Sequence, residues 1–174
     1  MNAIIFHGTG PHASYDKFWY RPLAQSLTEA GIDADVPELA QLDREPLDDT
    51  LKEFDALNIP IDENTVLIGH SAGVSFILAL LERLHSPVKA CYMIAGYCSP
   101  NGMKHAALKD SYAWDDIKAN AGECYIFNSF NDPFKCNQDK GIELFNHVGG
   151  TLLLRNDGHF LQKQQPLLLK LILP

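Results

Sequence analysis

The chain has 174 residues, of which 46% are hydrophobic and 21% charged, a balance typical of one globular domain, which we expect to span residues 1–174. This composition excludes a disordered chain, and no apolar stretch reaches the roughly 18 residues that a membrane-spanning helix needs. The net charge of −8 argues against a nucleic-acid partner, because binding to phosphate depends on clustered Lys and Arg. We expect a small-molecule substrate and no membrane partner, and the oligomeric state stays open.

Residues 1–6 have no basic segment and too short an apolar run for a signal peptide, so they read as a strand and favour a cytoplasmic protein. The four cysteines have neither C-x-x-C spacing nor histidines at zinc-finger distances. A disulfide framework and a structural zinc site are therefore not expected, nor is any metal or organic cofactor. Cys91 and Cys124 lie in apolar runs and are expected to be reduced core thiols.

Short continuous apolar runs are typical of parallel strands that are buried on both faces. Five such runs occur, at residues 3–6, 65–68, 90–95, 124–127 and 151–154. A weaker sixth run at residues 32–36 carries acidic side chains, which predicts an edge strand.

Helical periodicity separates these runs. Pro22 and Pro46 open two amphipathic segments, and Gly31 ends the first of them. Residues 72–85 are apolar nearly all round, which predicts a helix covered on most sides, and a later helical pattern ends at Gly149. The alternation predicts an α/β fold of three αβα layers, with a mostly parallel sheet of about six strands.

The connection at residues 96–122 is long for its place and contains a weak helical patch at 114–119. In such folds this excursion lies near the carboxyl ends of the strands, where sites are built. Little other chain is left to form a cover. We therefore predict a shallow, accessible pocket and no large lid domain.

The sharpest motif is G-x-S-x-G, placed directly after one apolar run and before the apolar helix. It consists of Gly69, His70, Ser71, Ala72 and Gly73. In a nucleophile elbow, the serine sits in a strained turn that exposes its hydroxyl, and side chains at the two glycines would collide with neighbouring backbone. The alternative is a plain glycine-rich turn between a strand and a helix.

A serine nucleophile needs a base, which an acid in turn orients. Asp132 and then His159 follow the last two predicted strands, in the chain order Ser, Asp, His that this type of site requires. Asp157 is the rival acid, but it would have to fold back within the loop of His159, so we favour Asp132. The histidines in loops and on helix surfaces are interpreted as solvated; they are His12, His85, His105 and His147.

An oxyanion hole uses the backbone N–H of the residue after the nucleophile, here Ala72, and a second N–H from the loop after an early strand. Thr9 is assigned as the second donor, with Gly10 as the neighbour that could replace it. The same loop, residues 8–13, formally matches the dinucleotide motif G-x-G-x-x-A. Pro11 and the aromatic stretch after it delay the next helix, so no helix start remains to bind a pyrophosphate.

With these motifs in view, the chain resembles the small α/β-hydrolase-fold serine hydrolases that include retinoblastoma-binding protein 9 and its bacterial relatives. The resemblance covers nearly the whole chain and rests on the H-G loop, Trp19 and four short segments, at residues 69–73, 94–97, 131–133 and 158–160. It implies a compact fold without a large lid domain, with Ser71 as nucleophile, Asp132 as acid and His159 as base. The chain departs from the pattern at residues 9–11, and it lacks the L-x-C-x-E sequence, so the retinoblastoma partner is not expected.

The sequence therefore predicts a carboxylesterase-like serine hydrolase that cleaves a carboxylic ester or related acyl bond without a cofactor. The alternative is an interaction protein on a hydrolase scaffold whose catalysis is weak or lost. A dinucleotide-dependent oxidoreductase ranks third. Five aromatic side chains could wall the pocket or pack beneath loops; they are Tyr15, Phe18, Trp19, Trp114 and Phe134.

Overall fold

The computed structural model describes residues 1–10 and 14–173, and six strands alternate with six helices in this part of the chain. The strands are β1 (Asn2–Phe6), β2 (Asp33–Asp35), β3 (Thr65–His70), β4 (Ala90–Ile94), β5 (Glu123–Ser129) and β6 (Thr151–Arg155). The helices are α1 (Tyr20–Glu29), α2 (Leu47–Asp55), α3 (Ala72–Leu81), α4 (Trp114–Asn120), α5 (Gln138–Val148) and α6 (Pro166–Ile172).

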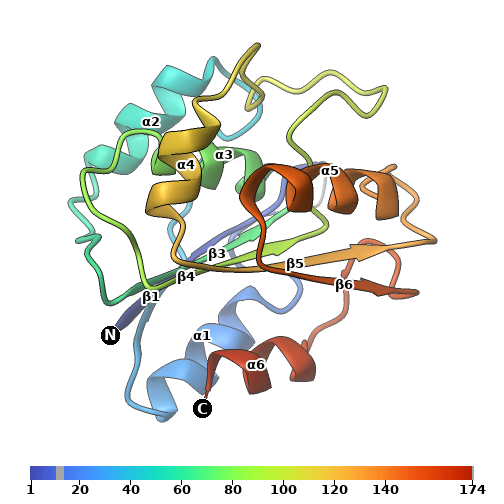
Figure 1. Ribbon diagram of the computed structural model, residues 1–174. Helices are drawn as coiled ribbons and strands as arrows, with labels where there is room; N and C mark the ends of the chain where they lie inside the picture. Colours follow the sequence, from blue (N-terminus) through green and yellow to red (C-terminus); the bar gives the residue numbers. More distant parts are fainter. Residues whose placement is uncertain (11–13, 174) are drawn as a thin grey trace.

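The strands form one sheet in the order β2-β1-β3-β4-β5-β6, and every neighbouring pair is parallel. Helices α2 to α5 cover one face of the sheet, and α1 and α6 lie together on the other (Figure 1). The predicted three-layer α/β fold is confirmed, including the edge position of β2, whose two aspartates are exposed.

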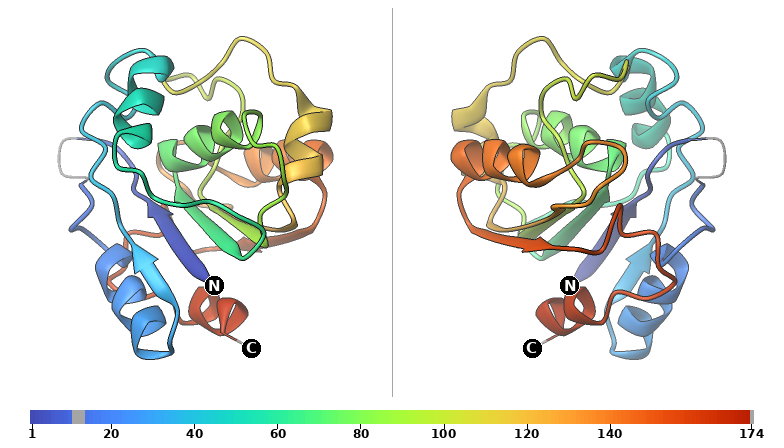
Figure 2. Two further views of the ribbon diagram at one scale, coloured as in Figure 1. Left: turned by 90° about the vertical axis from the view of Figure 1, so that its left-hand side faces the viewer. Right: turned by 90° about the vertical axis from the view of Figure 1, so that its right-hand side faces the viewer.

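Each face of the sheet carries its own apolar core, because side chains of a strand alternate between the faces. In β1, Ile4 and Phe6 join the core beneath α2 to α5, whereas Ala3 and Ile5 join the core beneath α1 and α6. Figure 2 shows the same two layers of helices from both sides. Helix α3 is buried along all ten of its residues, as its continuous apolar sequence predicts.

Two helix boundaries differ from the sequence predictions. Helix α1 begins at Tyr20 rather than Pro22, which lies within the first turn, where a proline costs no hydrogen bond. Helix α3 ends at Leu81, before His85, and the chain then turns toward Pro87. A proline disfavours helical backbone in the residue before it, so the apolar pattern overestimated the length of this helix.

The site-bearing loops all leave the carboxyl edge of this sheet. Strand β1 lies between β2 and β3, so the connections after β1 and β3 diverge to opposite sides. Ligands of open α/β sheets bind at such a switch point. The glycine loop at residues 8–10 and the elbow at residues 69–73 leave β1 and β3 there.

Two further sequence predictions concern membranes and cysteines. Among the residues described, none of the helices combines the length and the apolar character needed to cross a bilayer. Cys91 and Cys124 are buried and free, as predicted, and so are Cys98 and Cys136.

Candidate active site

Ser71 occupies the sharp turn between β3 and α3. Its backbone has φ 55° and ψ −119°, a strained combination for a residue with a side chain. A Cβ atom added at Gly73 would lie 2.4 Å from the carbonyl oxygen of Phe6, and one at Gly69 would lie 2.9 Å from backbone atoms of Gly73. These close approaches agree with the steric reason for the two glycines of the motif.

Asp132 and His159 meet at the carboxyl edge of the sheet, after β5 and β6. Nδ1 of His159 lies 2.7 Å from Oδ2 of Asp132, whose side chain is 0% exposed. The other carboxylate oxygen accepts the backbone N–H of Phe134 at 2.8 Å. Because an ionised carboxylate only accepts hydrogen bonds, Nδ1 of His159 donates to it, which leaves Nε2 free to act as a base.

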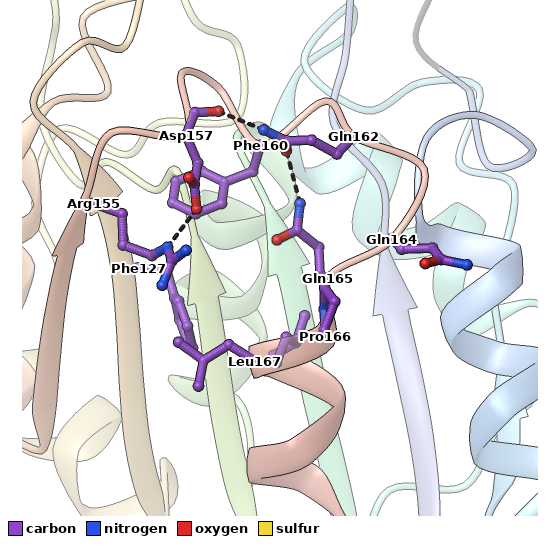
Figure 3. Close-up of a pocket in the computed structure, with 10 residues that line it drawn as sticks. Phe127, Arg155, Asp157, Phe160, Gln162, Gln164, Gln165, Pro166 and Leu167 are labelled. Carbon is purple, nitrogen blue, oxygen red and sulfur yellow. Dashed lines mark hydrogen bonds and ion pairs between the residues drawn. The ribbon is translucent and has the colours of Figure 1, made fainter.

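Asp157, the rival acid, has a different partner. Its carboxylate accepts a hydrogen bond from the Arg155 side chain, and its backbone carbonyl accepts one from Gln162 (Figure 3). These residues line a separate cavity of about 210 Å³ beside the start of α6. The structure therefore brings Asp132, and not Asp157, into contact with His159.

Ser71 and His159 line one cavity of about 210 Å³ at the switch point of the sheet. Its walls are formed by Gly8, Thr9, Gly10, Phe18, His70, Ser71, Met103, His105, Phe134, His159 and Leu161. In the part of the chain that the structure describes, Ser71 Oγ makes no hydrogen bond to His159. Such contacts are often long without substrate and shorten in the complex.

The glycine loop after β1 offers backbone donors to this cavity. The N–H of Gly8 donates to the Tyr20 hydroxyl at 3.0 Å, so it is already engaged. Thr9 and Gly10 line the cavity, and no acceptor for their N–H groups is found within the described part of the chain. Ala72 opens α3, where the first N–H groups of a helix have no acceptor within it. The choice between Thr9 and Gly10 stays open.

Helix α1 does not begin beside the glycines of the dinucleotide motif. Pro11, His12 and Ala13, its last three residues, lie outside the described residues. Helix α1 begins only at Tyr20, after a further turn of chain. The N-terminus of α1 is therefore not next to Gly8 and Gly10, where it could bind a pyrophosphate, in agreement with the sequence prediction.

His70, the residue before the candidate nucleophile, links the two loops of the site. Its Nδ1 lies 2.6 Å from the Tyr20 hydroxyl, which also accepts the N–H of Gly8, and its Nε2 lies 2.8 Å from the carbonyl oxygen of His159. A carbonyl only accepts, so Nε2 carries the proton and Nδ1 accepts from Tyr20. A neutral His70 thus ties the glycine loop to the backbone of His159, a role that the variable position of the motif did not indicate.

The interpretation of His105 as a solvated histidine was wrong. Its side chain is 7% exposed, and its Nδ1 lies 3.0 Å from the Asp43 carboxylate and 2.9 Å from the Tyr97 hydroxyl. Its Nε2 lies 2.9 Å from Oδ1 of Asn101. His105 therefore fixes the excursion at residues 96–122 against the loop before α2 and forms part of the cavity wall, which sequence spacing could not reveal.

Two of the five aromatic candidates line the pocket, and the other three lie outside it. Phe18 and Phe134 line the cavity of Ser71. Trp19 is fully buried and donates its indole N–H to the carbonyl oxygen of Phe160 at 2.8 Å. Trp114 instead stacks on His147, and Tyr15 lies beneath the Arg21 guanidinium.

We expect the stability of the protein to decrease below neutral pH. Burial lowers the pKa of His70 well below the ordinary 6.5, and it also lowers the pKa of His7. Below about pH 6.5 the unfolded chain therefore binds more protons at these two residues than the folded chain does. The free energy of unfolding should therefore fall between about pH 7 and pH 5, by up to about 1.4 kcal/mol per pH unit for each histidine.

Urea denaturation at a series of pH values measures this slope. His70→Gln keeps a donor toward His159 but cannot titrate, so its slope should be clearly smaller than that of the wild type. His85, exposed after α3, is the matched control, and His85→Gln should leave the slope unchanged. Equal slopes for His70→Gln and the wild type would contradict the assignment of a neutral, buried His70.

Solved structures with the same fold come from several bacteria. The ydeN gene product of B. subtilis is 22% identical, with a TM-score of 0.86 over 98% of this chain and 96% of that chain. A meta-cleavage product hydrolase from Pseudomonas fluorescens is 14% identical, with a TM-score of 0.74 over 99% of this chain and 89% of that chain. Est1E from Butyrivibrio proteoclasticus, solved with bound ferulic acid, is 12% identical, with a TM-score of 0.66 over 98% of this chain and 86% of that chain.

These matches confirm the α/β-hydrolase fold without a large lid domain. A search of the curated proteins finds no match. A family model described as serine hydrolase matches residues 3–165, nearly the whole chain. The resemblance stated from the motifs is thereby confirmed, and the chain belongs to the serine hydrolase family, small hydrolases with the α/β-hydrolase fold.

Proposed function

We propose that this hydrolase cleaves a carboxylic ester or a related acyl bond of a small molecule through a covalent intermediate on Ser71. The proposal rests mainly on the contact between His159 and Asp132, whose Nδ1 and Oδ2 atoms are 2.7 Å apart. His159 lines the same cavity as the strained Ser71. The three residues come from three loops at one edge of the sheet. Such a constellation matches the roles of nucleophile, base and orienting acid.

In the first half of the reaction, Ser71 Oγ attacks the acyl carbonyl carbon and its proton passes to Nε2 of His159. The imidazolium that forms is stabilised by the buried Asp132 carboxylate, which keeps the ring in its productive orientation. The leaving alcohol then takes the proton from His159 as the carbon–oxygen bond breaks. Ser71 is left as an acyl ester.

The negative charge that develops on the carbonyl oxygen needs donors in place before the reaction. The N–H of Ala72 and that of Thr9 supply them in this proposal, with Gly10 as the alternative to Thr9. In the second half, His159 deprotonates a water molecule, which attacks the acyl carbonyl carbon. The bond from this carbon to Ser71 Oγ then breaks, Oγ takes the proton back from His159, and the acid is released. Each proton lost by one group is thus gained by another, and no cofactor takes part.

The cavity favours short, uncharged acyl groups. Phe18, Met103, Phe134 and Leu161 form its apolar wall. Three of these side chains are also partly open to solvent, with exposed fractions of 44% for Met103, 43% for Phe134 and 40% for Leu161. A volume of about 210 Å³ is below the roughly 300–1,000 Å³ typical of drug-sized ligands, so the cavity fits a short acyl group.

A series of p-nitrophenyl esters, from acetate through butyrate and octanoate to palmitate, tests this proposal. Each buried methylene contributes about 0.8 kcal/mol, so kcat/KM should rise about fourfold per added carbon until the cavity is full. We expect the maximum among the short esters and a decline at octanoate and palmitate. Absence of hydrolysis across the whole series would contradict the proposal and favour the interaction-protein alternative.

A further inference from the structure

A second cluster of reactive side chains lies outside the cavity of Ser71. This cluster consists of Cys98, Glu143 and His147. Each residue offers one atom that could bind a metal ion, and the three atoms all lie within 4.8 Å of one another. Glu143 and His147 are four residues apart on α5, so both lie on one helix face. Cys98 follows β4 and is only 6% exposed. None of the three lines the cavity of Ser71.

From this geometry we infer that Cys98, Glu143 and His147 bind a divalent transition-metal ion, for which Zn²⁺ is the best fit. Thiolate, imidazole and carboxylate are the three ligand types that Zn²⁺ takes in proteins, at about 2.0–2.3 Å. Tetrahedral ligands at those distances lie roughly 3.3–3.7 Å apart, so small side-chain rotations suffice to close the cluster. Water would take the fourth position.

The carboxylate of Glu143 is already held in place by neighbouring groups. Oε2 accepts a hydrogen bond from Ser99 Oγ at 2.7 Å and contacts Lys140 Nζ at 3.0 Å. Within the described part of the chain, no hydrogen bond to Oε1 is found, so this oxygen is available to an ion. Partners that orient a ligating carboxylate are typical of metal sites. The positive charge of Lys140 repels a metal cation, and the negative charges of the Cys98 thiolate and the Glu143 carboxylate offset this repulsion.

The other two ligands are also held by their surroundings. The ring of His147 stacks on Trp114 of α4, with 3.9 Å between the ring centroids and an angle of 8° between the planes. The Cys98 thiol is buried, and burial raises its pKa to about 12, so it keeps its proton when no metal is bound. Coordination replaces the S–H bond by an S–Zn bond, and the proton passes to water.

An ion at this position would tie the segment after β4 to α5. In Figure 1, α4 and α5 lie next to each other on one face of the sheet. The long connection between β4 and α4 carries Met103 and His105 to the cavity of Ser71. A metal bound to Cys98 and α5 would therefore brace the base of this connection, and it takes no part in the acyl-transfer chemistry.

Cobalt(II) titration of the chelator-treated protein tests the site, because a cobalt–thiolate bond gives a charge-transfer absorption in the near ultraviolet. We expect one equivalent of Co²⁺ to produce this band in the wild type and Zn²⁺ to displace it. Cys98→Ser should abolish the band, and His147→Gln should weaken Co²⁺ binding at least tenfold. A wild type without the band would overturn the inference.

The matched control is a second cysteine with a histidine and a carboxylate nearby. Asp132, Cys136 and His159 also place three potential ligand atoms within 4.8 Å, and they include the proposed acid and base. Cys136→Ser should retain the cobalt–thiolate band. If Cys136→Ser loses the band and Cys98→Ser keeps it, the metal binds at the acyl-transfer site and the inference is wrong.

Glu143→Gln provides a variant that is expected to fold, because Glu143 is half-buried on the helix surface and glutamine has nearly the same size. Zn²⁺ stabilises a protein that binds it only in the folded state, so Zn²⁺ should raise the Tm of the wild type. The rise should be largely lost in Glu143→Gln. An equal rise in both proteins would show that Zn²⁺ binds elsewhere.

Discussion

Replacing Ser71 by alanine is expected to lower kcat for ester hydrolysis by roughly six orders of magnitude, as the loss of a serine nucleophile does in other hydrolases. Alanine removes only the Oγ atom, and its Cβ matches that of serine in the strained turn at φ 55°. The residual rate would come from substrate binding and the oxyanion donors alone.

A fluorophosphonate probe gives a second readout of the same substitution. The probe forms a covalent bond with an activated serine, so it should label the wild type and leave Ser71→Ala unlabelled. Ser26, on α1, donates to the carbonyl oxygen of Pro22 and serves as the matched control. Ser26→Ala should be labelled like the wild type, and equal labelling of Ser71→Ala would remove Ser71 as the nucleophile.

Replacing Asp132 by asparagine is expected to lower kcat by about four orders of magnitude while the fold is retained. The amide of asparagine can donate to Nδ1 of His159 and so favours the tautomer whose Nε2 carries a proton and cannot act as a base. The asparagine oxygen can still accept the backbone N–H of Phe134, which holds the side chain in place. The measurement is kcat for a short p-nitrophenyl ester.

Asp157→Asn is the matched control, since it makes the same chemical change two residues before His159. Asp157 pairs with Arg155 at a separate cavity, and a partly exposed ion pair of this kind contributes about 1 kcal/mol or less. Its kcat should stay close to that of the wild type. A larger loss in Asp157→Asn than in Asp132→Asn would reverse the assignment of the acid.

The local features of the fold could be predicted from the sequence because they depend on neighbouring residues. A continuous apolar run such as 65–68 between turn signals is typical of a strand covered on both faces, and the glycines at 69 and 73 fit positions where neighbouring backbone approaches closely. The end of α3 was missed, because hydrophobic periodicity continued to His85 while the backbone already turned toward Pro87. Hydrophobic periodicity indicates which side chains are buried, but it does not indicate where the helical backbone ends. Here the end of the helix depends on the proline that follows.

The contacts between distant loops could not be predicted in the same way. His105 and Asp43 lie in loops that are 62 residues apart in the chain, and neither has a sequence pattern that indicates its partner. The same holds for His70, whose bonds to Tyr20 and to the backbone of His159 join three segments. Cys98, Glu143 and His147 lack every spacing that marks a zinc site in sequence.

The amino-acid sequence by itself determined the fold class, the family and the chain order of Ser71, Asp132 and His159, because strand patterns and turn glycines are encoded within short segments. Only the tertiary structure decided which carboxylate contacts His159, which histidines line the cavity and which side chains gather around Cys98. Those choices depend on how parallel strands bring the ends of separate segments to one edge, and on the hydrogen bonds that buried polar groups must then complete.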